Sequence, residues 1–163
     1  RVGFSRVHSE NPFTLLPALA ERLHRETPCV IVDFHACATA EKQALFFHAD
    51  GKVSAVIGSH GRVATSDETI LPSGTACLTD AGRTGSIDSV GGSDPAPKIR
   101  EYLARVPDWS RDAWERPALQ GVILELDGSG KAVSIKRISM AAPEPPRAEG
   151  GEANAGKGED SQG

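Results

Sequence analysis

Two short apolar runs, separated by a helix-like segment, most constrain what this chain can fold into. Residues 29–33 read Cys-Val-Ile-Val-Asp, which predicts a strand buried on both faces. Thr39 can cap a helix that Asp50-Gly51 ends, and a second β-rich run follows over residues 53–57. A strand, a helix and another strand in this order are typical of parallel strands with a crossover helix, and they indicate an α/β protein.

The other predicted elements extend this unit on both sides. Asn11-Pro12 has the pattern of a helix N-cap with a first-turn proline, and leucines recur at helical spacing up to about Glu26. Further along we expect a strand over 75–79, a helix capped by Ser93 or Asp94 and ended by Pro107, and a β-hairpin over 120–126 and 132–138. Together these elements predict a mixed sheet with flanking helices and a closing β-hairpin.

Composition divides the 163 residues into a foldable part, 1–140, and a tail, 141–163. The tail has five glycines, three prolines and no valine, isoleucine, leucine or aromatic residue, so we expect it to be disordered and acidic. It carries a net charge of −3, which leaves −1 on residues 1–140. This balance argues against a duplex nucleic-acid partner, and no apolar run is long enough to span a membrane.

Three cysteines, Cys29, Cys37 and Cys77, lack the paired spacing of zinc ribbons or disulfide scaffolds. We interpret them as reduced, mostly buried thiols, which favours a cytoplasmic location. The sequence begins at Arg1 without a charged and apolar leader, so we expect either a start that has been removed or a part of a longer chain.

Two histidines follow the predicted parallel strands. His35 comes just after residues 29–33, and His60 follows residues 53–57 through Gly58-Ser59. Ligands of open α/β sheets bind at the carboxyl ends of strands, and neutral imidazoles there could coordinate one or two metal ions. The alternative is that both are hydrogen-bonded structural residues, and spacing alone does not decide between them.

Several motifs add a family resemblance to this pattern. They occur in order, with few gaps, between about Asn11 and Ile138: residues 11–13, 32–36, 38–42, 50–60, 65–72, 74–76, 79–82, 84–85 and 88–89, followed by the hairpin. This succession resembles the YmdB-like branch of the calcineurin-type metallophosphoesterases. The resemblance implies the C-terminal half of a four-layer sandwich of two sheets flanked by helices.

The resemblance also implies an activity and a cofactor. These are hydrolysis of phosphodiesters, notably 2′,3′-cyclic nucleotides, at a dinuclear centre of divalent metal ions such as iron or manganese. His35 would be a metal ligand, and His60 would be the first ligand of a His-x-His pair.

Two residues depart from the family pattern. Arg62 stands where the second histidine of the pair would fall, and arginine offers only donors, so it cannot ligate a metal. It could bind the substrate phosphate instead, or it could mark a site that is no longer used. Cys37 replaces a common acidic residue, and it could either bind zinc next to His35 or be a small apolar replacement.

The ligands of the family's N-terminal half, an Asp, an Asn-Gly-Glu-Asn run and an Asn-His pair, are absent from residues 1–10. Two hypotheses stay open. The chain is the C-terminal portion of a phosphodiesterase that is not competent alone, or it is a non-catalytic pseudoenzyme or interaction module. A half sandwich leaves a sheet face uncovered, so we expect a missing N-terminal half or self-association.

The remaining candidates have ordinary explanations. Asp80 and Asp88, with Arg83 between them, could touch substrate or metal, but aspartate and glycine also form turns. Trp109 and Trp114 predict a packed cover over the sheet. The histidines that we expect on the surface are His8, His24 and His48.

Overall fold

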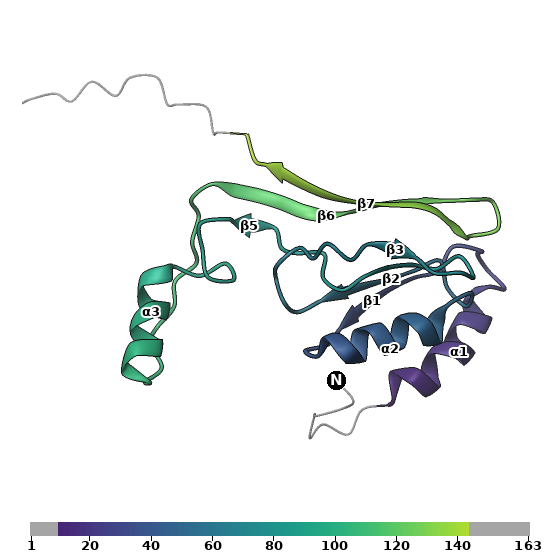
Figure 1. The fold of residues 1–163 in the computed structure, drawn as a ribbon, viewed down its shortest axis with the longest axis horizontal. Helices are drawn as coiled ribbons and strands as arrows, with labels where there is room; N and C mark the ends of the chain where they lie inside the picture. The colour runs from purple at the N-terminus through teal and green to yellow at the C-terminus, as the bar shows by residue number, and fades with distance from the viewer. Residues whose placement is uncertain (1–9, 144–163) are drawn as a thin grey trace, which may run out of the picture.

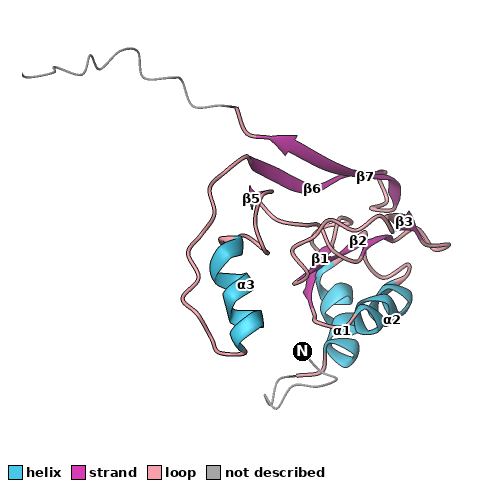
Figure 2. Ribbon diagram, turned by 60° about the vertical axis from the view of Figure 1, so that its left-hand side comes forward, coloured by secondary structure: helices cyan, strands magenta, loops and turns pink. Residues whose placement is uncertain are grey.

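The computed structural model describes residues 10–143. Helices α1 (Pro12–Leu23) and α2 (Thr39–Ala49) lie on one face of a four-stranded sheet, and the hairpin of β6 (Pro117–Leu126) and β7 (Ala132–Ala141) lies across the other face (Figure 1). Helix α3 (Pro95–Ala104) stands apart from this stack (Figure 2). The molecule therefore has a helical layer and two β layers, as the sequence predicts in outline.

The four-stranded sheet contains the predicted parallel strands. Its order is β1-β2-β4-β3, with β1 (Ile31–His35), β2 (Ala55–Ser59) and β4 (Ala76–Leu78) parallel and the short β3 (Thr69–Ile70) antiparallel at one edge. Strands β2 and β4 form the interior of the sheet, where Val56, Cys77 and Leu78 have no exposed surface. A second, three-stranded sheet pairs β5 (Gly85–Ser86) with the hairpin.

The prediction that the first strand is buried on both faces is wrong. Phe34 is buried, but Ile31, Asp33 and His35, on the opposite face of β1, are exposed, Ile31 to 56%. The reason lies in the position of the strand: among residues 10–143, β1 pairs only with β2 and so lies at a sheet edge. The hairpin packs against β3 and β4 at the other edge, and its cover does not extend to β1.

The hydrophobic core lies between the sheet and the two helices. Its members come from α1, β1, α2, β2 and β4 and include Leu16, Ala20, Phe34, Leu45, Phe46, Val56 and Cys77. No helix in residues 10–143 has the length and apolar character needed to cross a membrane.

The helix ends confirm some capping predictions and correct others. Asn11 caps α1, because its Oδ1 accepts from the Phe13 amide at 3.0 Å. Asp94 caps α3 by accepting from the Ala96 amide at 2.9 Å. Thr39 is not the cap of α2: Ala38 takes that position without a side-chain bond, and Thr39 is already helical.

The C-terminal limits of elements also differ from prediction. Helix α3 ends at Ala104, before Pro107, because Arg105 adopts a left-handed conformation with φ of 57°. The hairpin strands are longer than predicted at their outer ends, where Ala118 pairs with Ala141. Ala141 thus belongs to a strand rather than to the predicted tail, and residues 144–163 and His8 lie outside the described part.

Candidate functional site

The structure brings the two predicted ligand histidines into contact. His35 is the last residue of β1, and His60 directly follows β2, whose Ser59 is in register with His35. The distance between His60 Nδ1 and His35 Nε2 is 3.0 Å, and the rings meet edge to face at 82°. The carboxyl ends of two parallel strands therefore present a pair of imidazoles, although their role as ligands stays a prediction.

A hydrogen-bonded chain behind His35 sets its orientation. The Ser59 hydroxyl donates to Asp33 Oδ1 at 3.2 Å and lies 3.1 Å from His35 Nδ1. Because this hydroxyl hydrogen is used on Asp33, its oxygen is placed to accept the Nδ1–H of His35. The lone pair of His35 then lies on Nε2, facing His60, which is the tautomer that a metal ligand needs.

The loop that carries His60 has a strained backbone and is hydrogen-bonded to Asp80. His60 has φ of 111° and Arg62 has φ of 58°, values that non-glycine residues rarely adopt. The Gly61 amide between them donates to Asp80 Oδ2, and a Cβ at Gly61 would lie 2.9 Å from that oxygen. A side chain at position 61 would therefore require the Asp80 carboxylate to shift.

Asp80 is buried and bonds the loop that carries His60, while its contact with substrate or metal stays a prediction. It is 2% exposed, and its carboxylate also accepts from the Gly82 amide at 3.0 Å and pairs with Lys42 Nζ at 3.4 Å. Sequence reasoning misses Lys42, because a lysine in a predicted amphipathic helix reads as solvent-facing. Asp88 instead forms an exposed ion pair with Arg116 at 3.0 Å.

Asp67 forms hydrogen bonds at the carboxyl end of β4, directly before Asp80. Its carboxylate accepts from the hydroxyl and, at 3.2 Å, from the amide of Thr79. Burial raises the pKa of Asp67, but the hydrogen bonds from Thr79 and Thr65 outweigh it and hold the pKa below its usual value. The carboxylate thus stays ionised and fixes the strand end next to Asp80.

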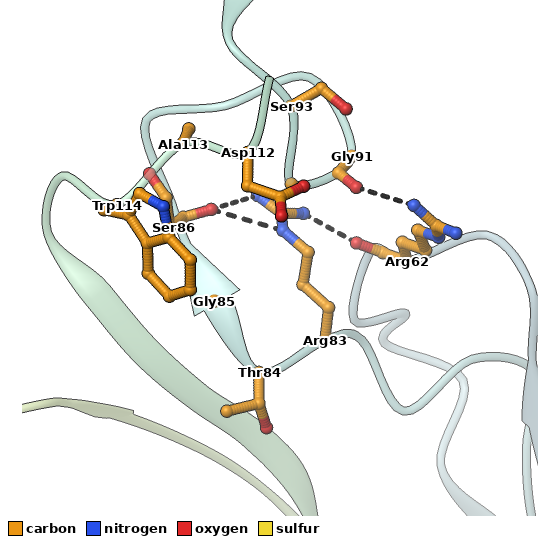
Figure 3. A pocket seen from close by; sticks show the side chains of 11 residues that line it. Arg62, Arg83, Thr84, Gly85, Ser86, Gly91, Ser93, Asp112, Ala113 and Trp114 are labelled. Atoms are coloured by element: carbon orange, nitrogen blue, oxygen red, sulfur yellow. Dashed lines mark hydrogen bonds between the residues drawn. The ribbon is translucent and has the colours of Figure 1, made fainter. Parts of the chain in front are cut away.

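Arg62, two residues after His60, and Arg83 line a pocket of about 330 Å³ (Figure 3). Arg83 donates to the Ser86 carbonyl at 2.8 and 3.2 Å, to Ser89 Oγ at 3.1 Å and to the Arg62 carbonyl at 2.7 Å. Arg62 donates through Nη1 to the Gly91 carbonyl at 3.0 Å. Arg83 therefore connects the strained loop to the glycine-rich segment, and the Arg62 guanidinium is directed towards Gly91 (Figure 3).

The burial of the tryptophans and of two cysteines differs from what the sequence predicts. Trp109 and Trp114 are 92% and 77% exposed, so neither is a packed cover; Trp114 lines the pocket instead. Cys29 and Cys37 are exposed, and only Cys77 is buried. His24 is exposed as predicted, whereas His48 is half-buried and bonds the Phe13 carbonyl at 2.7 Å.

The residues present fit part of a metal centre. Two imidazoles can give two ligands to one ion, and Cys37 Sγ lies 4.0 Å from His60 Nδ1. Within residues 10–143, however, no three His, Cys, Asp or Glu side chains gather closely enough to hold an ion. A dinuclear centre needs several oxygen and nitrogen ligands, and the two imidazoles are the part of such a set that the described residues bring together.

A helical layer against a mixed sheet, with a hairpin sheet across its other face, gives a mixed α/β fold that solved structures of similar sequence share. The model of the family described as YmdB-like protein matches residues 1–138, and the chain belongs to that family. Both findings confirm the family and the fold class predicted from the sequence.

Individual relatives agree with this assignment. The chain is 40% identical over 130 residues to the 2′,3′-cyclic-nucleotide 2′-phosphodiesterase of Bacillus subtilis (strain 168), covering 79% of this chain and 49% of the relative. A hypothetical protein from Thermus thermophilus has a TM-score of 0.73 at 36% identity, over 82% of this chain and 52% of the other. A phosphatase from Mycoplasma pneumoniae has a TM-score of 0.75 at 33% identity, over 83% and 48%. The chain thus spans about half the length of these proteins.

Proposed function

We propose that this chain supplies the histidine-bearing part of a centre that hydrolyses phosphodiesters, with 2′,3′-cyclic nucleotides as the substrate class. The 3.0 Å contact between His60 Nδ1 and His35 Nε2, at the carboxyl ends of adjacent parallel strands, carries the proposal. Membership of the family supports it, as does the name of the Bacillus relative.

Each residue has a defined part in this proposal. His35 and His60 would hold a divalent ion such as manganese or iron, which when bound polarises a phosphoryl oxygen and lowers the pKa of a coordinated water. Ser59 orients His35, and Asp80 orients the loop that carries His60. Arg62 contacts a phosphate oxygen through its guanidinium and adds a fixed positive charge beside the reacting group.

The ligand count limits what the chain does unaided. Residues 10–143 offer two imidazoles, and a dinuclear centre needs more ligands than these. We therefore propose that turnover requires a second polypeptide segment with carboxylate, amide or imidazole ligands. This requirement makes the chain a contributor to a phosphodiesterase rather than an enzyme by itself.

A non-catalytic module is the second candidate, and the contacts of Arg62 favour it. Its guanidinium bonds the Gly91 carbonyl and its own carbonyl accepts from Arg83, so the place of a ligand histidine is occupied by contacts within the protein. Such contacts would preserve the shape of the loop after the metal is lost.

A complementation assay separates the two candidates. The chain is incubated with Mn²⁺ and 2′,3′-cyclic AMP, alone and together with the segment of the Bacillus relative that it does not match. We expect hydrolysis only in the mixture, and less than one bound ion per molecule of the chain alone. His35→Ala should reduce hydrolysis by the mixture by roughly 100-fold or more.

His24→Ala is the matched control. This histidine bonds the Thr27 and Lys52 carbonyls near the amino end of β2, away from the imidazole pair, so its loss should leave hydrolysis unchanged. A mixture that is inactive, although both components are folded, would favour the module. Two tightly bound ions and turnover by the chain alone would overturn the requirement for a second segment.

A further inference from the structure

The pocket that Arg62 and Arg83 line has further wall residues that the proposed hydrolysis does not use. Its walls come from the loop after β2, from residues 83–93 and from residues 112–114 (Figure 3). We propose that this pocket is a nucleoside subsite, in which Trp114 stacks on the base and Asp112 accepts hydrogen bonds from the ribose or the base. The ligand class rests on the proposed function, but the subsite is argued from the pocket itself.

The walls of the pocket are fixed before any ligand arrives. The Ala113 amide donates to the Gly92 carbonyl at 2.9 Å, and the Asp94 amide donates to the Arg111 carbonyl at 2.8 Å. Together with the four hydrogen bonds of Arg83, these contacts join all three wall segments. A preformed pocket loses little ordering entropy when it binds, which is typical of small-molecule sites.

The polar groups of the pocket differ in how far the protein already uses them. The guanidinium of Arg83 donates hydrogen bonds to Ser86, Ser89 and the Arg62 carbonyl, so its role is to hold the pocket walls together. Arg62 makes one side-chain hydrogen bond to a described residue, which leaves Nε and Nη2 as donors for an anion. The Asp112 carboxylate accepts none from the described residues, and so it retains its acceptor capacity for ligand hydroxyl or amino groups.

Trp114 completes this set with a flat apolar surface. Its side chain lies on the side of the pocket opposite Arg62, and the residue is 77% exposed (Figure 3). An exposed indole facing a guanidinium and a carboxylate suits a ligand with a planar ring, hydroxyl groups and a negative charge. A nucleotide has all three, and Arg62, two residues after His60, would place its phosphate towards the imidazole pair.

Tryptophan fluorescence tests the subsite without catalysis. The chain has two tryptophans, so Trp109→Phe leaves Trp114 as the only emitter and Trp114→Phe leaves Trp109, which lies outside the pocket. Each variant is titrated with 2′,3′-cyclic AMP in the presence of a metal chelator. We expect saturable quenching in the Trp109→Phe protein and none in the Trp114→Phe protein. By calorimetry, Trp114→Ala should weaken binding roughly tenfold.

Further probes define the contacts. Ribose 5-phosphate has a sugar and a phosphate but no base, and it should leave the emission of Trp114 unchanged. Asp112→Asn should weaken binding of the cyclic nucleotide, whereas Asp108→Asn, which alters a carboxylate outside the pocket that pairs with Arg100, should not. Equal quenching by ribose 5-phosphate, or no saturable quenching in the Trp109→Phe protein, would overturn the subsite.

These outcomes are independent of the proposed function. The chelator removes metal-dependent turnover, so binding is read whether or not the chain contributes to an enzyme. Quenching without hydrolysis in the complementation assay would keep the subsite and reject the phosphodiesterase. Hydrolysis without quenching would reject the subsite and keep the phosphodiesterase.

Discussion

The three cysteines have different environments that their spacing does not reveal. Cys29 and Cys37 are exposed, whereas Cys77 lies in β4, inside the four-stranded sheet, with no exposed surface. Burial raises the pKa of the Cys77 thiol to about 12, and the nearby Asp50 carboxylate acts in the same direction. Because only the thiolate is strongly nucleophilic, Cys77 is protected both by its protonation and by its inaccessibility.

We therefore predict that a disulfide reagent at pH 8 labels two thiols of the native chain rapidly and the third only after denaturation. Cys29→Ser and Cys37→Ser should each remove one rapid equivalent, and Cys77→Ser should remove none. The count is read from the absorbance of the released thiolate. Three rapid equivalents in the native protein would show that β4 is accessible.

Sequence reasoning works for some single residues and not for others, and His35 and Lys42 show why. The position of His35 follows from the end of a strand, which is a local property, so its place at the carboxyl end of β1 could be predicted. Lys42 pairs with Asp80, 38 residues away, and this contact exists only once α2 packs beside the end of β4. Trp114 likewise meets Arg62 at the pocket only in the folded chain, so the sequence could not assign its indole to the pocket.

Among the helices and strands, the Lys42–Asp80 ion pair joins α2 to the loop that follows β4. Both side chains are buried, and Asp80 also holds the loops at Gly61 and Gly82. Removing one member of such a pair leaves a buried charge without its partner, which costs about 3–5 kcal/mol. The pair therefore contributes to the orientation of His60 as well as to the stability of the fold.

We predict that Lys42→Met lowers the free energy of unfolding by about 3 kcal/mol, measured by urea denaturation. Lys98→Met is the matched control, because Lys98 pairs with Glu101 at 2.8 Å on the more exposed helix α3, where such pairs contribute about 0–1 kcal/mol. The double variant Lys42→Met with Asp80→Leu should recover part of the loss, since neither charge then remains buried. Equal effects of the two single lysine variants would contradict this account.

The existence of the helices and strands could be predicted more fully than their surroundings. Caps predict α1 and α3, and periodicity predicts the helices and the hairpin, because these signals lie within each segment. The burial of β1 could not be read in this way, since a short apolar run looks the same whether one face or two are covered. Its exposed face at Ile31 depends on where the hairpin packs, and that is decided at β3 and β4.

Large apolar side chains are exposed on several elements of residues 10–143, and three of these elements bear on association. The side chains lie on β1 at Ile31, on α3 at Tyr102 and Leu103, which are each 80% exposed, and on the hairpin at Ile123 and Val133. Of these, β1 and β7 are also edge strands within the described residues. Edge strands with apolar side chains pair readily with other chains. Because β7 packs against β3 and β4, we expect association to begin at β1.

We predict that the chain self-associates through this edge when no other segment covers it. In sedimentation velocity experiments, the average sedimentation coefficient should rise with protein concentration. Ile31→Lys should suppress the rise, because a charge on an edge strand opposes strand pairing. Tyr102→Lys is the matched control: it adds the same charge at an exposed apolar position on α3, and it should leave association unchanged if β1 is the contact. A constant coefficient of monomer size for the unaltered chain would show that the exposed edge does not pair.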